Sequence, residues 1–383
     1  MHSTRYLIVG AGMTGDMAAK GIREHDADGA ITIVGAEPHP PYKRPPLTKG
    51  LWKGAPEEKL WREPAAGAEL VTGRRIVSLD LDARTAADDR GEEYAWEKLL
   101  LATGARPREI PGAEGVVWFR TLDDYRRLRE QAVDGARVVV IDGGFIGSEL
   151  AAALTEAGCR VTMLFPEPGI AHRLLPADLS ASVTDSYRER GVDVRAGETV
   201  AGVSGGAVHT GSGEALAADA VVAGLGVVPN VELAEAAGLE VGNGIVVDEH
   251  GRASGREDVF AAGDVANFPV PVLGSSMRIE HEDHANTHGR TVGANMAGAG
   301  IAYEHLPFFY SDLFDLGYEA VGEVDSRLET VARWDEPFRK GVVAYVDAEQ
   351  RPRGFLLWNV WDKIDDAREA IRAAQPVGEG LLV

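Results

Sequence analysis

The sequence predicts an α/β protein with two Rossmann-like, doubly wound domains and a C-terminal α+β domain. Three observations predict it. A strand, a glycine-rich turn, a helix and a second strand follow one another at the start of the chain. The same pattern returns from residue 137. After about residue 303, aromatic residues become frequent and strand patterns occur in pairs. The length of 383 residues agrees with several domains, because one hydrophobic core rarely serves so long a chain.

The first glycine turn follows a short apolar strand pattern at residues 5–9. Gly10 allows the tight turn, Gly12 lets the backbone approach a pyrophosphate, and Gly15 lets the helix pack closely on the strand. Glu37 follows the next strand, where a carboxylate can accept hydrogen bonds from ribose hydroxyls. This frame predicts a dinucleotide site, and the alternative is a turn with only a structural role.

The second glycine turn is imperfect. Asp142 stands where the first glycine is expected, whereas Gly144 and Gly147 are in place. Asp tolerates unusual backbone angles less well than Gly, and its charge would lie near a pyrophosphate. Glu167, after the next strand, is the candidate ribose acceptor. Two alternatives therefore stay open: a working dinucleotide site, or a weakened and partly structural turn.

Three further strand patterns end in turns at residues 99–104, 221–226 and 259–264. Near the C-terminus, residues 341–346 and 354–360 have the pattern of paired strands separated by a polar turn. We interpret this last region as the α+β domain.

The composition limits the function classes. The formal net charge is −21 and the sequence pI is about 4.9, so long-range repulsion disfavours DNA, RNA and anionic lipid. We expect neither a nucleic acid nor a membrane as a partner. No apolar run approaches the roughly 20 residues of a membrane helix, and the first strand leaves no room for a signal peptide. We therefore expect a cytoplasmic protein.

Cysteine usage limits the redox chemistry. Cys159 is the single cysteine, so neither an internal disulfide nor a C-x-x-C pair can form. This excludes thiol–disulfide reductase chemistry within the chain. We interpret Cys159 as a small, semi-buried residue between a helix and a strand.

Several motifs together resemble a known family over nearly the whole chain. They are PYKRPPLTK at 41–49, ATGARP at 102–107, GGFIGSE at 143–149, LFPE at 164–167, AGD at 262–264, EHEDHA at 280–285, GYEA at 317–320 and LWN at 357–359. The chain resembles the FAD-dependent pyridine nucleotide-disulfide oxidoreductases, in the rubredoxin and ferredoxin reductase group. Within that group it is most similar to the bacterial relatives of apoptosis-inducing factor.

The resemblance implies two cofactors, FAD and NADH. It assigns FAD to a discontinuous domain of residues 1–115 and 245–302, and NADH to residues 116–244, followed by the α+β domain at 303–383. No arginine pair lies beside Glu167 to hold a 2′-phosphate, which favours NADH over NADPH.

For FAD, the resemblance implies contacts from the first nucleotide motif, from several of the other motifs and from the third domain. They are Gly10, Gly12, Gly15, Glu37, Arg44, Lys49, Ala102, Thr103, Gly104, Arg120, Asp264, Glu280, His281 and Tyr310. For NAD they are Gly144, Phe145, Ile146, Gly147, Glu167, Arg173, Gly226, Glu319 and Asn359.

Three residues receive catalytic roles from the resemblance. Lys49 and Glu149 match a buried ion pair near the reactive flavin nitrogen, and His281 matches a residue at the pyrimidine edge of the flavin. The alternatives are a surface lysine at position 49 and simple core packing for Tyr310. His284 and His288 are four residues apart, as metal ligands on a helix can be, but no third ligand is evident, so we expect no metal.

The implied activity is hydride transfer from NADH to flavin N5, followed by electron transfer to an external acceptor. Without a cysteine pair, that acceptor is a ferredoxin or rubredoxin, a quinone or oxygen. The alternative is a slow-turnover, redox-sensing flavoprotein of the apoptosis-inducing factor type, which forms a long-lived charge-transfer complex. Accordingly, we expect a monomer or an NADH-linked homodimer.

Overall fold

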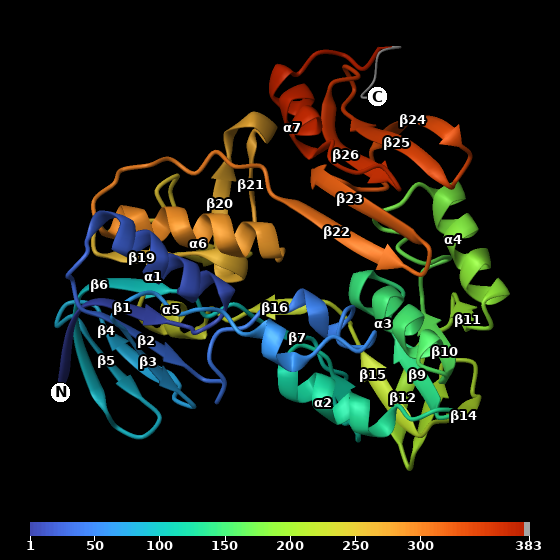
Figure 1. The fold of residues 1–383 in the computed structure, drawn as a ribbon, viewed down its shortest axis with the longest axis horizontal. Helices are drawn as coiled ribbons and strands as arrows, with labels where there is room; N and C mark the ends of the chain where they lie inside the picture. Colours follow the sequence, from blue (N-terminus) through green and yellow to red (C-terminus); the bar gives the residue numbers. More distant parts are fainter. Residues whose placement is uncertain (379–383) are drawn as a thin grey trace. The chain divides into compact units, whose positions relative to one another are not determined.

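The computed structural model describes residues 1–378, which divide into two compact units (Figure 1). The first unit consists of Met1–Lys43, Glu57–Arg106 and Val228–Pro307. The second consists of Arg44–Pro56, Pro107–Val227 and the chain from Phe308 onward. The second glycine turn and the C-terminal sheet lie in the same unit, and the three-domain boundaries given above stay a prediction.

The first unit is built on a seven-stranded sheet in the order β3-β2-β1-β6-β5-β4, with β19 also paired to β6. Strands β3, β2, β1, β6 and β19 run parallel, whereas β5 and β4 join as antiparallel strands. The bounds are β1 His2–Val9, β2 Ile31–Gly35, β3 Ala68–Thr72, β4 Ile76–Asp80, β5 Thr85–Asp88, β6 Glu93–Leu101 and β19 Val259–Ala261. The parallel core and its crossover helix confirm the first doubly wound domain.

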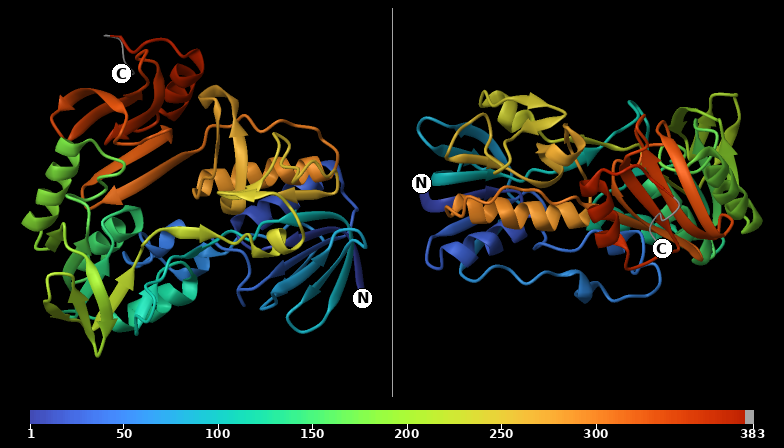
Figure 2. Two further views of the ribbon diagram at one scale, coloured as in Figure 1. Left: turned by 180° about the vertical axis from the view of Figure 1, so that it is seen from behind. Right: turned by 90° about the horizontal axis from the view of Figure 1, so that it is seen from above.

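Two helices of this unit, α1 (Met13–His25) and α6 (Glu282–Met296), approach each other closely. A Cβ at Gly21 would lie 2.1 Å from the carbonyl oxygen of Arg290, and one at Gly293 would lie 2.0 Å from that of Ala18. Only glycine allows this backbone-to-backbone contact. It lets α6 pack directly against α1 (Figure 2).

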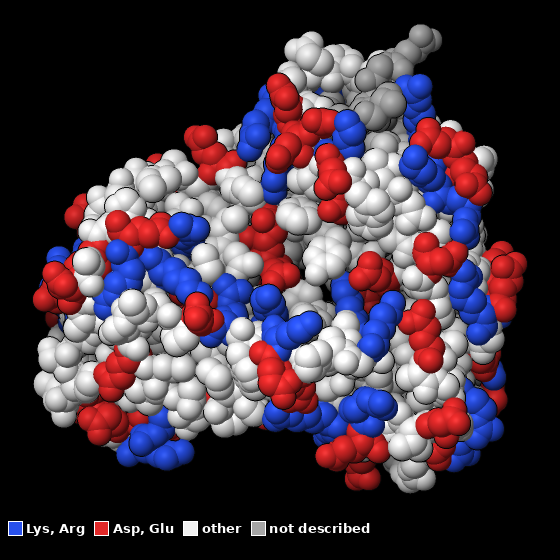
Figure 3. All heavy atoms as spheres, viewed as in Figure 1, with Lys and Arg blue, Asp and Glu red and all other residues white. Residues whose placement is uncertain are grey.

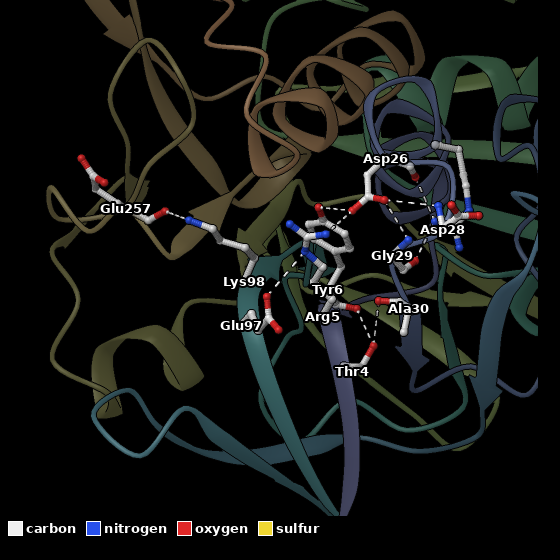
Figure 4. A network of polar contacts seen from close by, with 11 residues as sticks. Thr4, Arg5, Tyr6, Asp26, Asp28, Gly29, Ala30, Glu97, Lys98 and Glu257 are labelled. Carbon is white, nitrogen blue, oxygen red and sulfur yellow. Dashed lines mark hydrogen bonds and ion pairs between the residues drawn. The ribbon is translucent and has the colours of Figure 1, made fainter.

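The loop between α1 and β2 is held by one carboxylate (Figure 4). Asp26 accepts hydrogen bonds from the Tyr6 hydroxyl and from Arg5, each at 2.8 Å, and from the backbone N–H of Gly29, also at 2.8 Å. Tyr6 is buried in β1, and burial followed by the hydrogen bond to Asp26 raises its pKa to about 12. This network joins the first strand to the start of the second.

The rest of the first unit is a four-stranded sheet with short helices. Its order is β17-β18-β20-β21. The elements are α5 Glu232–Ala236, β17 Val241–Gly242, β18 Gly244–Val246, β20 Ala266–Val270, β21 Ser275–Met277, and the 3-10 helices η2 Glu57–Leu60, η3 Gly263–Val265 and η4 Pro271–Leu273. The chain passes between the units at β7 Ala105–Pro107 and β16 Val227–Pro229.

The second unit contains a fully parallel five-stranded sheet in the order β11-β10-β9-β15-β8. Its elements are β8 Val116–Trp118, α2 Leu122–Gln131, β9 Arg137–Ile141, α3 Phe145–Glu156, β10 Arg160–Phe165, α4 Ala177–Glu189, β11 Asp193–Ala196 and β15 Ala220–Ala223. A small antiparallel sheet accompanies them, with β12 Val200–Ser204, β13 Ala207–Thr210 and β14 Ala215–Ala217. The second doubly wound domain is thereby confirmed.

The C-terminal region forms an antiparallel sheet in the order β22-β23-β26-β25-β24. Its elements are β22 Phe308–Leu313, β23 Leu316–Gly322, β24 Glu329–Glu336, β25 Lys340–Val346, β26 Pro352–Trp358 and α7 Ile364–Ala373. A short segment of the second unit, Arg44–Pro56, contains the 3-10 helix η1 Pro45–Leu47 and carries Lys49 of the PYKRPPLTK motif. Within residues 1–378, no helix is both long and apolar enough to cross a bilayer.

Acidic and basic side chains are interspersed over the surface seen in Figure 3. The excess of acidic residues in the composition is therefore spread over many positions of that face.

Candidate functional site

The first glycine turn leaves open space at the start of α1. Gly10 has a φ of +120°, and a Cβ there would lie 2.1 Å from the carbonyl oxygen of Ala102. A Cβ at Gly15 would lie 2.0 Å from the carbonyl oxygen of Gly10. At Gly12, the N-cap of α1, a Cβ would meet nothing within 4 Å. Two glycines thus serve chain packing, and the third leaves the positive end of the helix accessible to an anion such as a pyrophosphate.

Other residues predicted to contact FAD come from the carboxyl ends of neighbouring parallel strands. Ala102, Thr103 and Gly104 directly follow β6, and Asp264 lies in η3 directly after β19. A Cβ at Gly263 would lie 2.2 Å from Thr14 Oγ1, which places η3 beside the first turn of α1. Ligands of doubly wound sheets bind at this edge, next to the switch point.

Glu37 is oriented by a residue that the sequence did not single out. Tyr42 donates a 2.6 Å hydrogen bond from its hydroxyl to Glu37 Oε2. Tyr42 is buried, so it holds the carboxylate at the end of β2. The tyrosine lies inside the PYKRPPLTK motif, which was the available signal.

His281 is the N-cap residue of α6, and Glu280 pairs with Arg278 at 2.6 Å. Burial lowers the pKa of His281 to about 4, although Asp264 and Asp283 act in the opposite direction. A neutral His281 therefore stands at the start of a 15-residue helix, whose N-terminus favours negative charge. Glu280, His281 and Asp264 thus lie in the first unit with the glycine turn.

The remaining residues predicted for FAD lie in the second unit, around a buried ion pair. Lys49 Nζ pairs with Glu149 Oε1, and the Glu149 side chain is only 2% exposed. Thr48 donates from its hydroxyl to Glu149 Oε2 at 2.5 Å, and Ser311 donates to Oε1 at 2.7 Å. The Lys49 ammonium lies 5.1 Å from the centre of the Tyr310 ring. A buried charge needs such partners, because its desolvation is costly.

Sequence reasoning missed Thr48 and Ser311. Thr48 lies inside the PYKRPPLTK motif, next to Lys49, and Ser311 is adjacent to Tyr310, and these positions were the available signals. Arg44 donates from Nη1 to the backbone carbonyl of Arg120 at 2.8 Å, so these two predicted residues are neighbours.

Helix α3 joins this ion pair to the second glycine turn. Phe145 and Glu149 are four residues apart and share one face of α3. The Lys49 ammonium lies 5.6 Å from the centre of the Phe145 ring. A cavity of about 190 Å³ borders the pair and is lined by Lys53, Glu156 and other residues of the same unit. One helix therefore presents both a predicted nicotinamide contact, Phe145, and the buried carboxylate.

In the second glycine turn, Gly144 is the N-cap of α3 and Gly147 lies in its first turn, next to Phe145 and Ile146. Asp142 accepts hydrogen bonds from the N–H groups of Gly144 and Gly147, each at 2.6 Å. The aspartate therefore caps the helix.

The predicted ribose acceptor is paired. Glu167 Oε1 lies 2.8 Å from the guanidinium of Arg173, whose side chain is 87% exposed. Gly226, after β15, has a φ of +77° and open space around it. Both residues belong to the same carboxyl edge of the parallel sheet as the glycine turn.

Two predicted NAD contacts lie in the C-terminal sheet and differ in character. Glu319 Oε2 on β23 is buried without a hydrogen-bond partner within residues 1–378, and burial raises the pKa of this carboxyl. Such an oxygen is suited to accept a hydrogen bond from a ligand. Asn359 donates to the Arg339 carbonyl and accepts from the Gly317 N–H, each at 2.8 Å. Its amide ties β23 to the residue that precedes β25, and its role in binding stays a prediction.

The two histidines of the metal alternative lie inside the first unit. The rings of His284 and His288 are 4.7 Å apart between centres, and His284 Nδ1 lies 3.0 Å from the Tyr303 hydroxyl. Among the described residues, no group of three or more His, Cys, Asp or Glu side chains could hold a metal ion.

Residues 4–289 match the family model of the pyridine nucleotide-disulphide oxidoreductases. The chain belongs to this family. Residues 292–337 also match the C-terminal model of apoptosis-inducing factor, mitochondrion-associated. The resemblance found in the motifs is thereby confirmed, including its apoptosis-inducing-factor side.

Similar proteins cover nearly all of the chain. It is 39% identical to the ferredoxin–NAD(+) reductase component of the anthranilate 1,2-dioxygenase system of Burkholderia cepacia, over 88% of this chain and 86% of that protein. It is 31% identical to apoptosis-inducing factor 1 of Dictyostelium discoideum, over 96% and 78%. The reductase in the covalent putidaredoxin reductase–putidaredoxin complex has a TM-score of 0.92 and 32% identity, with 100% of this chain and 96% of that chain covered.

Membership of the family settles the enzyme class and the cofactors. The chain is an FAD-dependent NAD(P)H oxidoreductase, with binding sites for FAD and for a nicotinamide dinucleotide. The open helix N-terminus at Gly12 and the buried oxygen of Glu319 fit such ligands. The roles of the individual residues stay predictions.

Proposed function

We propose that this oxidoreductase accepts hydride from NADH and passes the electrons to an external one-electron carrier of the ferredoxin or rubredoxin type. The observation that carries the proposal is the single cysteine: Cys159 is buried, and the sequence holds no second thiol with which it could form an internal acceptor. The electrons must therefore leave the protein. The two reductases described above, whose names include a ferredoxin or a putidaredoxin, support a small redox protein as the acceptor.

FAD, when bound, accepts two electrons as hydride and releases them singly. The chain contributes binding and orientation. The N–H groups at the start of α1 bind the pyrophosphate, and Glu37, held by Tyr42, binds ribose. Lys49 would supply a fixed positive charge to the bound flavin, and Glu149, with its donors Thr48 and Ser311, orients that charge. These groups are positioned before the substrate arrives, which lowers the cost of reaction.

Glu167 supports a preference for NADH. A carboxylate at the end of β10 accepts hydrogen bonds from two ribose hydroxyls but repels a 2′-phosphate. Its partner Arg173 is a single, exposed cation. Anaerobic titration of the flavin absorbance with NADH and with NADPH measures this preference directly, and we expect NADH to reduce the protein at the lower concentration.

The test of the main proposal is a stopped-flow experiment with the FAD-loaded protein under anaerobic conditions. NADH is expected to bleach the flavin absorbance, and a second mixing step with oxidised ferredoxin or rubredoxin is expected to restore it within one turnover. Flavin absorbance that does not change at millimolar NADH would refute the activity. Reduction by NADH followed by no reaction with any carrier would refute the acceptor class alone.

A second candidate function is slow-turnover redox sensing. The match of residues 292–337 to the C-terminal model of apoptosis-inducing factor favours it. In that case the NADH-reduced protein keeps a long-wavelength charge-transfer band and changes from monomer to dimer in sedimentation. Fast reoxidation by a carrier distinguishes the first function from this one.

A further inference from the structure

The two glycine turns differ in what occupies the space before the helix. In the first turn, a Cβ at Gly12 would meet no atom within 4 Å. At the matching position of the second turn, a Cβ at Gly144 would lie 3.0 Å from Asp142 Oδ1. The chain's own carboxylate therefore occupies a space that is open in the first turn.

This carboxylate uses the N–H groups that would face a pyrophosphate. Its Oδ1 accepts from Gly144, the N-cap of α3, and its Oδ2 accepts from Gly147, each at 2.6 Å. The first N–H groups of a helix are the donors that bind anions. A dinucleotide at this turn thus meets N–H donors that Asp142 already occupies. Its negative pyrophosphate is also repelled by the negative carboxylate of Asp142.

The surroundings of Asp142 leave the carboxylate little room to withdraw. A Cβ at Gly224, in the turn after β15, would lie 2.5 Å from Asp142 Oδ2. The charged groups that act on it are Glu167 and Arg173, which both follow β10 and form an ion pair with each other. Helix α3 presents backbone N–H groups to the Asp142 carboxylate. Strand β15 presents no charged group to it, because the residue that follows the strand is Gly224.

We propose that Asp142 couples binding of the nicotinamide dinucleotide to the uptake of one proton by its carboxylate. The proton comes from solvent, and it returns to solvent when the dinucleotide leaves. The neutral carboxyl group still accepts one backbone hydrogen bond, and its new O–H can donate to a pyrophosphate oxygen. This inference rests on the proposed use of NADH and names a residue that determines its affinity.

The electrostatics of the site agree with proton exchange near neutral pH. Burial raises the pKa of Asp142 to about 7, although the N–H groups of Gly144 and Gly147 lower it. Glu167 acts to raise this pKa, and Arg173 acts to lower it. A bound pyrophosphate adds negative charge and raises the pKa further.

The direction of the pH effect follows from the difference between the pKa of Asp142 in the free protein and in the complex. Well below pH 7 the carboxyl is largely protonated in the free protein, and affinity is highest. Above pH 7 each pH unit weakens binding by up to about tenfold, because a proton must be taken up first. The weakening of binding with pH continues until the pH reaches the pKa of Asp142 in the complex.

The experiment is isothermal titration calorimetry of the oxidised, FAD-loaded protein with NAD⁺ between pH 6 and pH 9. Two buffers of different ionisation enthalpy report the number of protons taken up. ADP-ribose is titrated in parallel because it carries the same pyrophosphate without the nicotinamide. The expected result is a Kd that rises with pH for both ligands, with proton uptake on binding at pH 8.5.

Matched variants assign the effect to the residue. Asp142→Asn is expected to bind NAD⁺ with a Kd that no longer depends on pH, and Asp142→Gly, which restores the usual glycine, is expected to do the same. Asp134→Asn changes an exposed aspartate of the same unit and should keep the wild-type pH dependence. Glu167→Gln is expected to weaken binding but to keep a pH dependence.

Three outcomes overturn the proposal. One is a wild-type Kd that is constant over this pH range, and another is a pH dependence that survives in Asp142→Asn. The third is a pH dependence lost in Glu167→Gln but not in Asp142→Asn, which would assign the proton to Glu167. If NAD⁺ binds at no pH and NADH also fails to bleach the flavin, the proposed function itself is overturned.

Discussion

At the scale of single residues, the most consequential feature is the group of donors around Glu149. Its carboxylate is nearly inaccessible and is met by an ammonium and two hydroxyls. A buried pair of this kind contributes modestly to stability as a pair, but removing one partner leaves an uncompensated buried charge. The pair is therefore suited to hold a fixed charge in one place.

Replacement of Lys49 tests this arrangement. We expect Lys49→Met to lower the free energy of unfolding by about 3–5 kcal/mol, whereas the double variant Lys49→Met, Glu149→Gln should lose less than the sum of the single variants. Urea unfolding of the FAD-loaded proteins measures both. Lys53→Met is the matched control, because Lys53 is 58% exposed and its ion pair with Glu156 should contribute at most about 1 kcal/mol. Equal losses at positions 49 and 53 would contradict the buried-charge explanation.

Asp26 provides a second test at this scale. Its pKa is lowered first by the hydrogen bond from the Tyr6 hydroxyl, and further by the N–H of Gly29 (Figure 4). A carboxyl with a lowered pKa stabilises the fold above its usual value of 3.8 and loses this contribution as the pH falls through the folded-state pKa.

We therefore expect Asp26→Asn to melt at a lower temperature than the wild type at pH 6, with a difference that shrinks as the pH is lowered toward 3. Thermal unfolding followed by circular dichroism over this range measures the difference. Asp28→Asn, an exposed neighbour, is the control and should melt like the wild type. A constant difference at every pH would show that the network acts through packing alone.

At the scale of elements, the sheets and their crossover helices follow the sequence patterns closely. The strand predicted at residues 5–9 is β1, and the glycine turns stand between strand and helix as predicted. Most of β6 (Glu93–Leu101) was missed, because its first half alternates the buried Tyr94 and Trp96 with exposed or half-buried residues and only its end is a continuous apolar run. The continuous apolar run at the end of the strand was recognised, whereas the short alternation before it was not.

The contact of α1 with α6 gives a prediction about elements. A Cβ at Gly293 would meet three backbone atoms around Ala18 between 2.0 and 2.7 Å, and backbone cannot move aside as a flexible side chain can. We expect Gly293→Ala to lower the free energy of unfolding by about 1–3 kcal/mol. Gly202→Ala, in β12, is the matched control, because a Cβ there meets nothing within 4 Å. Chemical unfolding of both variants checks this, and an unaffected Gly293→Ala would mean that the helices can separate at little cost.

At the scale of the whole molecule, the charge sets the conditions for meeting a partner. The formal net charge is −21, so a partner that is also acidic meets long-range repulsion. Repulsion between like charges lowers association rates, and salt screens it.

Electron transfer to an acidic ferredoxin should therefore speed up when ionic strength rises from about 0.01 M to 0.15 M, as the Debye length falls from about 30 Å to about 8 Å. Stopped-flow reoxidation of the NADH-reduced protein gives the second-order rate constant. An uncharged quinone serves as the control acceptor and should show no such dependence. A rate that falls with salt would reveal a local basic docking surface instead.

Much of the candidate site was predictable because its chemistry is local in sequence. The glycines, Glu37 and Glu167 occupy fixed places around a strand–turn–helix unit, so spacing alone identified them. Lys49 and Glu149 were paired only through the family resemblance, because they are far apart in the chain. Their hydroxyl donors, Thr48 and Ser311, were missed for the same reason: no local pattern marks a residue whose partner lies on another element.

By itself, the sequence determined the fold class, the two dinucleotide turns and the absence of an internal dithiol acceptor, since each follows from short-range spacing or simple counting. Only the tertiary structure decided what Asp142 does. Whether a carboxylate in a glycine turn faces solvent or caps the helix depends on the directions of nearby N–H groups and on how closely Gly224 approaches. Those directions exist only after strand and helix have packed together. The sequence could therefore mark Asp142 as unusual but could not give its contacts.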